Sequence, residues 1–300
     1  MPNTSFPKIY FNTPIFLRQI LPAGTPAFDF QVEEQNSQAF IRFGLDDGIF
    51  RSPFKATFGG FEGLGEVSPS LLQNLFQQIK KKAKELGCTQ ITITQSPNCY
   101  LSESQQAVLQ QAYLEAGFQI AYTDTNFHIP VTSTPYIESL QPRTAQRVRQ
   151  QLKLGYEVVQ VEQANLTWFY EQIAHNRHSK GRPLNQSLAA FEYAFAQNPA
   201  QYAIFSVLNI EKECLAFSIC TLLGTSLYTF YTVNLAEGKS LNPLYLLHNH
   251  LNGFCLQQEI PLLDLGIATD KGIDNKGLIN FKTQLKAIPS KKITWINHLS

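Results

Sequence analysis

The stretch Leu262-Leu-Asp-Leu-Gly-Ile-Ala-Thr-Asp-Lys-Gly-Ile-Asp-Asn-Lys-Gly-Leu-Ile-Asn-Phe-Lys282 carries most of the information about the fold. Its apolar start, Leu262 to Leu265, predicts a short strand that ends at Gly266, and a helix is expected to open near Gly277 after a polar loop. A strand, a flexible loop and a helix start can place backbone N–H groups and a lysine around an anionic group. An ordinary strand-to-helix connection is the alternative that the same pattern allows.

Two motifs within this stretch resemble the C-terminal signature of the FemABX peptidyltransferases and their BioF2-like relatives in the GNAT acyltransferase superfamily. Those proteins carry an Asp-Phe/Leu-Gly strand end, as at Asp264-Leu-Gly266, and then a Gly-Leu/Val-x-x-Phe-Lys segment, as at Gly277-Leu-Ile-Asn-Phe-Lys282. The resemblance covers roughly residues 65 to 290. It implies a bacterial-type acyltransferase with a GNAT fold.

Composition narrows the class of protein. The chain has 300 residues, of which 44% are hydrophobic, enough for one large core or two medium cores. A net charge of +1 gives no global field for nucleic acid or an anionic membrane. We find no apolar run long enough to span a membrane and no secretion signal at the N-terminus. The 5 cysteines show no Cys-x-x-Cys spacing, so we expect reduced thiols, no metal site and a cytoplasmic location.

The first half of the chain predicts strands followed by an α/β unit. Segments 28–32 and 39–44 alternate apolar and polar residues, and 54–61 repeats this pattern up to Gly59-Gly60, where a neighbouring strand or a ligand comes close. Ser68-Pro69 opens a helix that ends at Gly87. A strand at 90–94, a helix at 103–116 and a strand ending near Val131 follow. The lysines at 80, 81, 82 and 84 are most simply a solvated face, with phosphate or tRNA binding as the alternative.

The second half repeats this order with more complete elements. Residues 132–142, with two prolines and several hydroxyls, are the candidate linker, and a short basic helix precedes Gly155. The remaining expected elements are strands at 158–161, 202–208, 214–222, 226–233 and 293–297, helices at 167–177 and 187–196, and a helix that starts at Asn242-Pro243. With the strand and helix of the C-terminal stretch, this is the element order of a GNAT domain. We therefore predict an α/β (α+β) fold of two tandem GNAT-like domains, residues 1–134 and 135–300, with mixed sheets flanked by helices and the first domain abbreviated.

Three residues are candidates for catalysis. By the resemblance, Lys282 matches the lysine of the family's Phe-Lys pair, which is implicated in stabilising charge at the reacting carbonyl. An ammonium near that oxygen favours the transition state over the ground state. Asp264, at a strand end, could pair with a lysine or act as a base, and Tyr231 could donate a proton; a cap and a packing residue are the respective alternatives. Phe281 is assigned to substrate binding or to the core.

The resemblance implies that the donor enters where the strand at 226–233 separates from the strand at 262–265. The loop 235–242 follows the first of these strands. This loop keeps Gly238 of the family's acetyl-CoA-binding pattern and carries Lys239, Ser240 and Asn242, which we assign to cofactor binding. Because the rest of the pattern is missing, the donor could be acyl-CoA or aminoacyl-tRNA, and no permanently bound cofactor is expected.

Basic residues are candidates for holding an anionic acceptor. Arg147 and Arg149 lie on the basic helix, and Lys180 and Arg182 lie in the loop after the helix 167–177; a solvated surface is the alternative for all four. The predicted function is transfer of an acyl or aminoacyl group to the amine of a small molecule or cell-wall precursor. A catalytically silent GNAT-like protein that binds a metabolite or partner is the alternative.

Overall fold

The computed structural model describes residues 6–14, 16, 26–54, 56–162, 165–182, 184, 186–235, 238 and 242–299. The chain divides into two compact units. Unit 1 comprises Met1–Asn126, Thr269–Asp274 and Ser290–Ser300, and unit 2 comprises Phe127–Ala268 and Asn275–Pro289. None of the helices in the described part of the chain has the length and apolar character that a membrane crossing requires.

Unit 1 is built on a mixed sheet with the strand order β1-β2-β3-β5-β14. The short strand β4 pairs with the first residues of β2. Its strands are β1 (Ala27–Glu34), β2 (Ser37–Asp46), β3 (Ile49–Ser52), β4 (Glu62–Leu64), β5 (Gln90–Thr94), the first part of β6 (Gln119–Pro130) and most of β14 (Ile288–His298). Strands β3 and β5 pair in parallel, whereas the pairs β1–β2, β2–β3, β2–β4 and β5–β14 are antiparallel.

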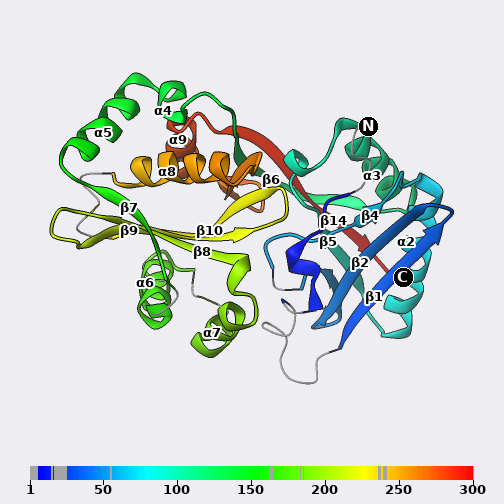
Figure 1. The fold of residues 1–300 in the computed structure, drawn as a ribbon. Coiled ribbons are helices and arrows are strands. Elements are labelled where there is room, and N and C mark those ends of the chain that lie inside the picture. Colours follow the sequence, from blue (N-terminus) through cyan, green and yellow to red (C-terminus); the bar gives the residue numbers. More distant parts are fainter. Residues whose placement is uncertain are drawn as a thin grey trace. The chain divides into compact units, whose positions relative to one another are not determined.

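Two helices cover the sheet of unit 1, α2 (Pro69–Glu85) and α3 (Glu103–Glu115) (Figure 1). The predicted start of α2 is confirmed, because the Ser68 hydroxyl accepts a hydrogen bond from the Leu71 N–H at 3.1 Å. One apolar face of the helix packs on the core, where Leu72 and Phe76 are buried. Gly87, with φ of +69°, follows the end of the helix.

The strand predicted at residues 54–61 is wrong. The chain leaves the sheet after β3, and within the described residues of this segment only Gly59 returns to it, through an isolated parallel bridge to Gln95. Gly60 has φ of +89°, and a Cβ atom there would collide with the Gln95 side chain. Close approach of the neighbouring chain at Gln95, and not a ligand, therefore explains the glycine pair.

Unit 2 has a sheet with the order β6-β11-β10-β9-β8-β7. Its strands are the end of β6, β7 (Glu157–Val161), β8 (Tyr202–Leu208), β9 (Cys214–Leu222), β10 (Ser226–Asn234) and β11 (Leu262–Ile267). Its helices are α4 (Tyr136–Ser139), α5 (Pro142–Lys153), α6 (Leu166–His178), α7 (Leu188–Gln197), α8 (Leu244–Gln257) and α9 (Lys276–Gln284). Helices α6 and α7 cover one face of this sheet, and α4, α5, α8 and α9 cover the other (Figure 1).

Two details of unit 2 differ from the prediction. The candidate linker 132–142 holds α4, whose Tyr136 hydroxyl donates to the Leu285 carbonyl, so this segment is packed and not an open connection. Helix α8 begins at Leu244 without a side-chain cap, so the predicted cap at Asn242 is not formed. Asn242 has φ of +52°, and its carbonyl accepts from the Tyr245 N–H.

The two units share one order of elements. An antiparallel meander (β1-β2-β3 or β8-β9-β10) is followed by a helix, a strand parallel to the last meander strand, and a second helix. A last strand then closes each repeat, β6 after α3 and β14 after α9. Most of β14 belongs to unit 1, where it pairs with β5, and the end of β6 belongs to unit 2, where it lies beside β11. The predicted mixed α/β fold class is confirmed.

Candidate active site

In unit 2, the parallel strands β10 and β11 separate soon after they meet. Their pairing covers three positions, from Ser226 opposite Leu262 to Tyr228 opposite Asp264. Beyond these, β10 continues to Asn234 along β9, with a register shift between Thr229 and Tyr231. The family resemblance implied this separation, which leaves the end of β11 without β10 beside it.

The equivalent position in unit 1 is closed. There, β3 and β5 pair from Ile49 opposite Gln90 to Ser52 opposite Ile93. The chain then returns at Gly59, whose N–H donates to the Thr94 carbonyl at 2.8 Å and whose carbonyl accepts from the Ser96 N–H at 3.1 Å. Backbone therefore fills the position that is open in unit 2, and unit 2 is the better candidate for binding a donor.

Lys282 reaches the separated end of β11 from helix α9. Its Nζ donates to the carbonyls of Gly266 at 2.7 Å and Ile267 at 2.9 Å, and it lies 5.7 Å from the centroid of the Phe127 ring. The side chain is 4% exposed, so it does not face bulk solvent. The ammonium therefore binds backbone carbonyl oxygens in the part of β11 that no longer pairs with β10.

Burial changes the acidity of this ammonium. Removal from water lowers the pKa of Lys282 to about 7, and the Asp264 carboxylate opposes this shift. At neutral pH the side chain can therefore be either charged or neutral. Two of its three hydrogens go to the carbonyls named above, and the third has no hydrogen-bond partner among the described residues, so it can be donated to a substrate oxygen.

Asp264 lies in the centre of this site. It is fully buried in β11, and its Oδ1 accepts from the Gly266 N–H at 2.8 Å. Thr229 of β10 donates its hydroxyl to the Asp264 carbonyl at 3.2 Å. Both backbone groups of Gly266 are thus taken by side chains, the N–H by Asp264 and the C=O by Lys282. Gly266 has φ of +73°, a conformation that suits glycine.

Phe281 and Arg147 border the site on the side of α8. The half-buried Phe281 ring stacks on Tyr245 at 5.5 Å and packs against the His248 ring at 5.6 Å. The Arg147 guanidinium lies 5.9 Å from the centroid of the Tyr245 ring. His248 is buried, and desolvation lowers its pKa to about 4, so the ring is neutral at pH 7.

Tyr231 lies on the face that α6 covers, because its partner Ile219 is two residues from Phe217, which packs against Phe169 at 4.9 Å. Burial raises the pKa of Tyr231 to about 12, an effect that the nearby Arg177 opposes. This phenol is therefore a donor and not a base at neutral pH. The Nε of Arg177 is buried and has no hydrogen-bond partner among the described residues.

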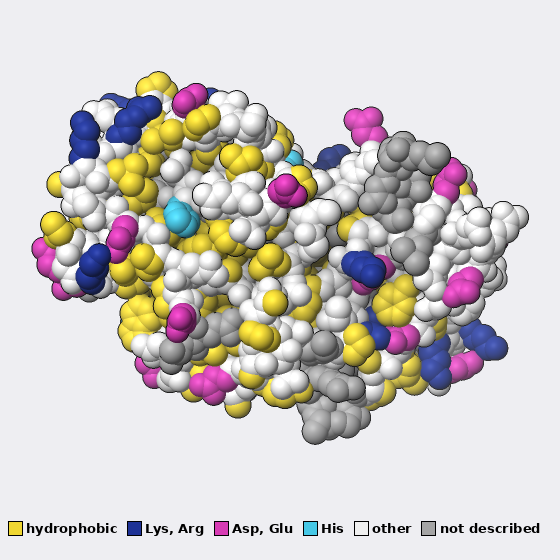
Figure 2. All heavy atoms as spheres, in the orientation of Figure 1, with side chains coloured by type: hydrophobic (Ala, Val, Ile, Leu, Met, Phe, Trp, Pro, Cys, Tyr) yellow, Lys and Arg dark blue, Asp and Glu magenta, His cyan; other side chains and the backbone are white. Residues whose placement is uncertain are grey.

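The other predicted binding residues are not gathered around Lys282. Arg149 is exposed on α5, where Figure 2 shows Lys and Arg side chains together on the surface. Lys180 and Arg182 are exposed after α6, and the backbone N–H groups of both donate to the Arg177 carbonyl. These two residues thus neighbour Arg177, and Arg149 belongs to the basic surface of α5.

The loop 235–242 is described only in part. Gly238 is buried, and a Cβ atom there would collide with the Leu215 carbonyl of β9, so close packing accounts for this glycine. Asn242 forms the turn before α8. Lys239 and Ser240, assigned to cofactor binding by the sequence, lie outside the described residues.

Two residues of unit 2 that lie near the candidate site were not predicted from the sequence, Arg177 and His128. Arg177 is one of several basic residues near the end of α6, and only the register of β10 shows that it meets Tyr231. His128 lies in β6, next to β11, and the Asp264 carboxylate raises its pKa while burial lowers it. The alternation of polar residues along β6 was the available signal, but nothing in the sequence showed which strand would lie beside it.

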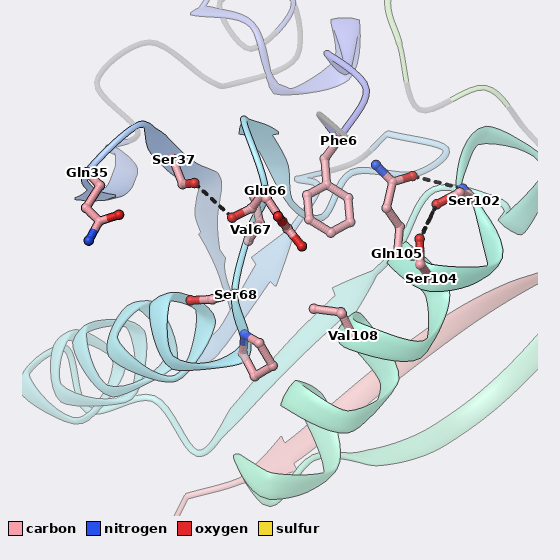
Figure 3. Close-up of a pocket in the computed structure, with 11 residues that line it drawn as sticks. Phe6, Gln35, Ser37, Glu66, Val67, Ser68, Ser102, Ser104, Gln105 and Val108 are labelled. Atoms are coloured by element: carbon pink, nitrogen blue, oxygen red, sulfur yellow. Dashed lines mark hydrogen bonds between the residues drawn. The ribbon is translucent and has the colours of Figure 1, made fainter. Parts of the chain in front are cut away.

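A cavity of about 520 Å³ lies in unit 1, away from all of these residues. Figure 3 shows it between the starts of α2 and α3, with Phe6 and Val108 on its walls. Its hydroxyls already bond within the protein: Ser37 donates to the Glu66 carbonyl, and Ser102 bonds to the start of α3. None of the predicted site residues lines this cavity, so the separated strands of unit 2 are the candidate site.

No protein-family model matches this sequence, and a comparison with curated proteins finds no match. Solved structures do match. FemX has a TM-score of 0.73 at 16% identity, over 99% of this chain and 93% of that chain. The C-terminal domain of a proposed lysylphosphatidylglycerol synthetase from Agrobacterium fabrum has a TM-score of 0.64 at 12% identity, over 96% and 87%. A tandem GNAT protein from the clavulanic acid biosynthesis pathway has 0.58 at 13%, over 94% and 86%.

At these identities the likeness is one of fold. It extends over nearly the whole chain, and the structures that match include both a FemX protein and a tandem GNAT protein. The resemblance drawn from Asp264-Leu-Gly266 and Gly277–Lys282 is thereby confirmed at the level of the fold. The chain has a FemX-like fold, which it shares with a tandem GNAT protein.

Proposed function

We propose that this protein is an N-acyltransferase that joins an acyl or aminoacyl group to an amine at the separated end of β11 in unit 2. The observation that carries the proposal is the buried ammonium of Lys282 beside strands β10 and β11, whose pairing stops after Tyr228 and Asp264. A carbonyl placed at this opening would meet a hydrogen-bond donor in surroundings from which water is largely removed, where such a donor acts most strongly.

The reaction requires little covalent chemistry from the protein. The amine nitrogen forms a bond to the acyl carbon, and the carbonyl electrons move onto the oxygen. The bond to the leaving group then breaks, and the leaving group departs with its electron pair. Lys282 in its charged form donates its third hydrogen to the developing oxyanion, and the carbonyls of Gly266 and Ile267 hold the ammonium in place.

We assign the acceptor to the face of the sheet that α6 covers. Tyr231 offers a phenol that stays protonated at neutral pH, and Arg177 offers a guanidinium whose buried Nε has no partner among the described residues. Lys180 and Arg182 add positive charge beside Arg177. This set favours an acceptor that carries a carboxylate or phosphate in addition to its amine, as a small metabolite or a cell-wall precursor does.

Two donor classes fit the proposal, acyl-CoA and aminoacyl-tRNA. The similar structures are named for AcCoA in one case and for lysylphosphatidylglycerol in another, so their names favour neither donor. The net charge of +1 gives tRNA no general attraction. Donor binding would use β10 and the start of α8, because both backbone groups of Gly266 already have side-chain partners.

A catalytically silent binding protein is the second candidate. The observation that favours it is that Asp264 and Lys282 already form hydrogen bonds with the N–H and the carbonyl of Gly266, to which a donor could otherwise bind. In this case the opening between β10 and β11 would bind a metabolite without transferring a group to it.

Thermal unfolding with each donor class, followed by a transfer assay, separates the two candidates. A ligand that binds only the folded chain raises its melting temperature by mass action. We expect stabilisation by acetyl-CoA or by alanyl-tRNA, and formation of an acylated product when a lysine-containing peptidoglycan precursor or a simple primary amine is added. Stabilisation without product from any pair would favour the silent protein, and neither effect with either donor would contradict the proposal.

A further inference from the structure

We propose that His128 of β6 is the group that takes the proton from the attacking amine, a role that rests on the proposed acyl transfer. The residue lies in unit 2 on the strand next to β11. It belongs to no motif in the sequence, and only the fold brings it beside Asp264 and the end of β11.

Strand alternation sets the direction of the ring. On β6, Phe127 and Ile129 are buried in the core that includes α8, so His128 between them projects from the opposite face. On β11, Leu263 and Leu265 belong to the same core, so Asp264 between them also projects from the opposite face. Two neighbouring strands therefore present an imidazole and a carboxylate on one face of the sheet.

One nitrogen of the imidazole lacks a hydrogen-bond partner in the described part of the chain. Its Nδ1 is buried without a hydrogen-bond partner among the described residues, although most buried polar atoms in proteins have one. The ring as a whole is only half-buried, which leaves Nε2 as the nitrogen that can meet a substrate. A purely structural histidine would be expected to bond at least one ring nitrogen, as His248 does through Nδ1 and the Leu244 carbonyl.

His128 takes a proton from the amine and later passes a proton to the leaving group. As the C–N bond forms, the amine nitrogen becomes positively charged, and one of its protons moves to the Nε2 lone pair of His128. The imidazolium that results is stabilised by the Asp264 carboxylate. When the bond between the acyl carbon and the leaving group breaks, the leaving group keeps the electron pair and takes the proton from His128. The imidazole is then neutral again. No oxidant, reductant or metal is required.

The electrostatic surroundings suit a base at neutral pH. Burial lowers the pKa of His128 from its usual value of 6.5, and the Asp264 carboxylate on β11 is the charged group that opposes this shift. Lys282 on α9 interacts with the same carboxylate, and burial lowers the pKa of this lysine to about 7. Transfer that needs neutral His128 and charged Lys282 is lost at low pH through the first group and at high pH through the second.

Proton NMR of the histidine ring hydrogens tests the local part of this inference without any substrate. The His128→Asn variant assigns the resonance, and its titration midpoint in the wild-type protein is expected below 6.5. In Asp264→Asn the midpoint should fall further, because the carboxylate that stabilises the imidazolium is removed. A midpoint at or above 6.5, or one that Asp264→Asn leaves unchanged, would overturn the assignment.

The pH profile of transfer tests the catalytic part, with the donor and amine that give product in the wild-type protein. We expect His128→Asn and His128→Gln to lower kcat about 100-fold with little change in KM, and to remove the acid limb of the profile. The matched control is His250→Asn, since His250 is also half-buried and has a pKa lowered by burial, but lies on α8 against Phe205; it should keep the acid limb.

Melting temperatures close to the wild-type value show that these variants fold. If His128→Asn and His128→Gln keep the acid limb and most of the activity, the inference about His128 is wrong while acyl transfer stands. If the wild-type protein transfers no group from either donor, the proposed function fails, and the role of His128 fails with it.

Discussion

Lys282 meets two opposing conditions. Its burial removes most of the water around the ammonium, and the carbonyls of Gly266 and Ile267 replace part of that water. The motif in the sequence pointed to this residue, but not to its partners, because the carbonyls become available only where β10 leaves β11. The local sequence could therefore predict that Lys282 is a candidate site residue. The tertiary structure was needed to explain why the pKa of its ammonium is lowered.

Stability should depend on pH through this side chain. The folded-state pKa of Lys282 is lowered to about 7 from a usual value of 10.5, so between these values the unfolded chain binds a proton that the folded chain does not. The free energy of unfolding of the wild-type protein should therefore rise with pH in this window, by up to ~1.4 kcal/mol per pH unit, and the full cost remains below pH 7.

Urea unfolding between pH 7 and pH 9.5 measures this effect against Lys282→Met, which has no proton to bind. We expect the stability difference between the variant and the wild-type protein to change steadily across the window, in the direction that favours the wild-type protein at high pH. Parallel curves for the two proteins would show that Lys282 keeps an ordinary pKa.

The strands and helices differ in how far local patterns determined them. The meander β8-β9-β10 was predicted almost to the residue, since each strand is a long apolar run bounded by turn residues. The short strand β3 was missed, and 54–61 was wrongly taken as a strand, because the alternation there arises from side chains packed under a loop. The separation of β10 from β11 was expected from the family resemblance and not from the residues of β10.

Two glycine substitutions should have opposite effects on stability. Gly266 lies one residue before the end of β11 with φ of +73°, and a Cβ atom there would lie 3.4 Å from the Tyr228 ring, so Gly266→Ala should lower the free energy of unfolding by about 1–2 kcal/mol. Gly253 lies within α8 with open space around it, so Gly253→Ala should raise the free energy by up to ~1 kcal/mol.

Chemical unfolding of both variants measures these changes under identical conditions. Because Gly266 also holds Lys282 through its carbonyl, Gly266→Ala should reduce transfer activity as well, whereas Gly253→Ala should leave it unchanged. Equal effects of the two substitutions would show that the backbone at Gly266 is not constrained as described.

At the scale of the molecule, the main feature that the sequence did not reveal is the sharing of the closing strands. β14 pairs with β5 although Trp295 and its partner Ile93 are far apart in the chain, and the Trp295 ring stacks on Tyr113 at 4.5 Å. Such pairing cannot be read from local periodicity, since an apolar strand does not specify its neighbour. The predicted boundary at residue 134 assigns β14 to the other domain and therefore remains to be tested.

Fragments of the chain test this boundary. Residues 1–134 alone lack β14, which leaves the edge of β5 unpaired and Tyr113 without the Trp295 ring, so we expect no cooperative melting. The same fragment with residues 288–300 joined through a flexible linker should fold, as seen by circular dichroism and a sigmoidal melt. Cooperative unfolding of residues 1–134 alone would instead support the contiguous domain.

The central claim, that the Lys282 ammonium stabilises the oxyanion of acyl transfer, is tested most directly by the turnover of two lysine variants. Both Lys282 and Lys276 lie on α9, but Lys276 is exposed at its first position and Lys282 is buried at the end of β11. With a donor and amine that give product, we predict that Lys282→Met lowers kcat about 100- to 1000-fold while Lys276→Met stays close to the wild-type value. Equal turnover by Lys282→Met and the wild-type protein would contradict the account.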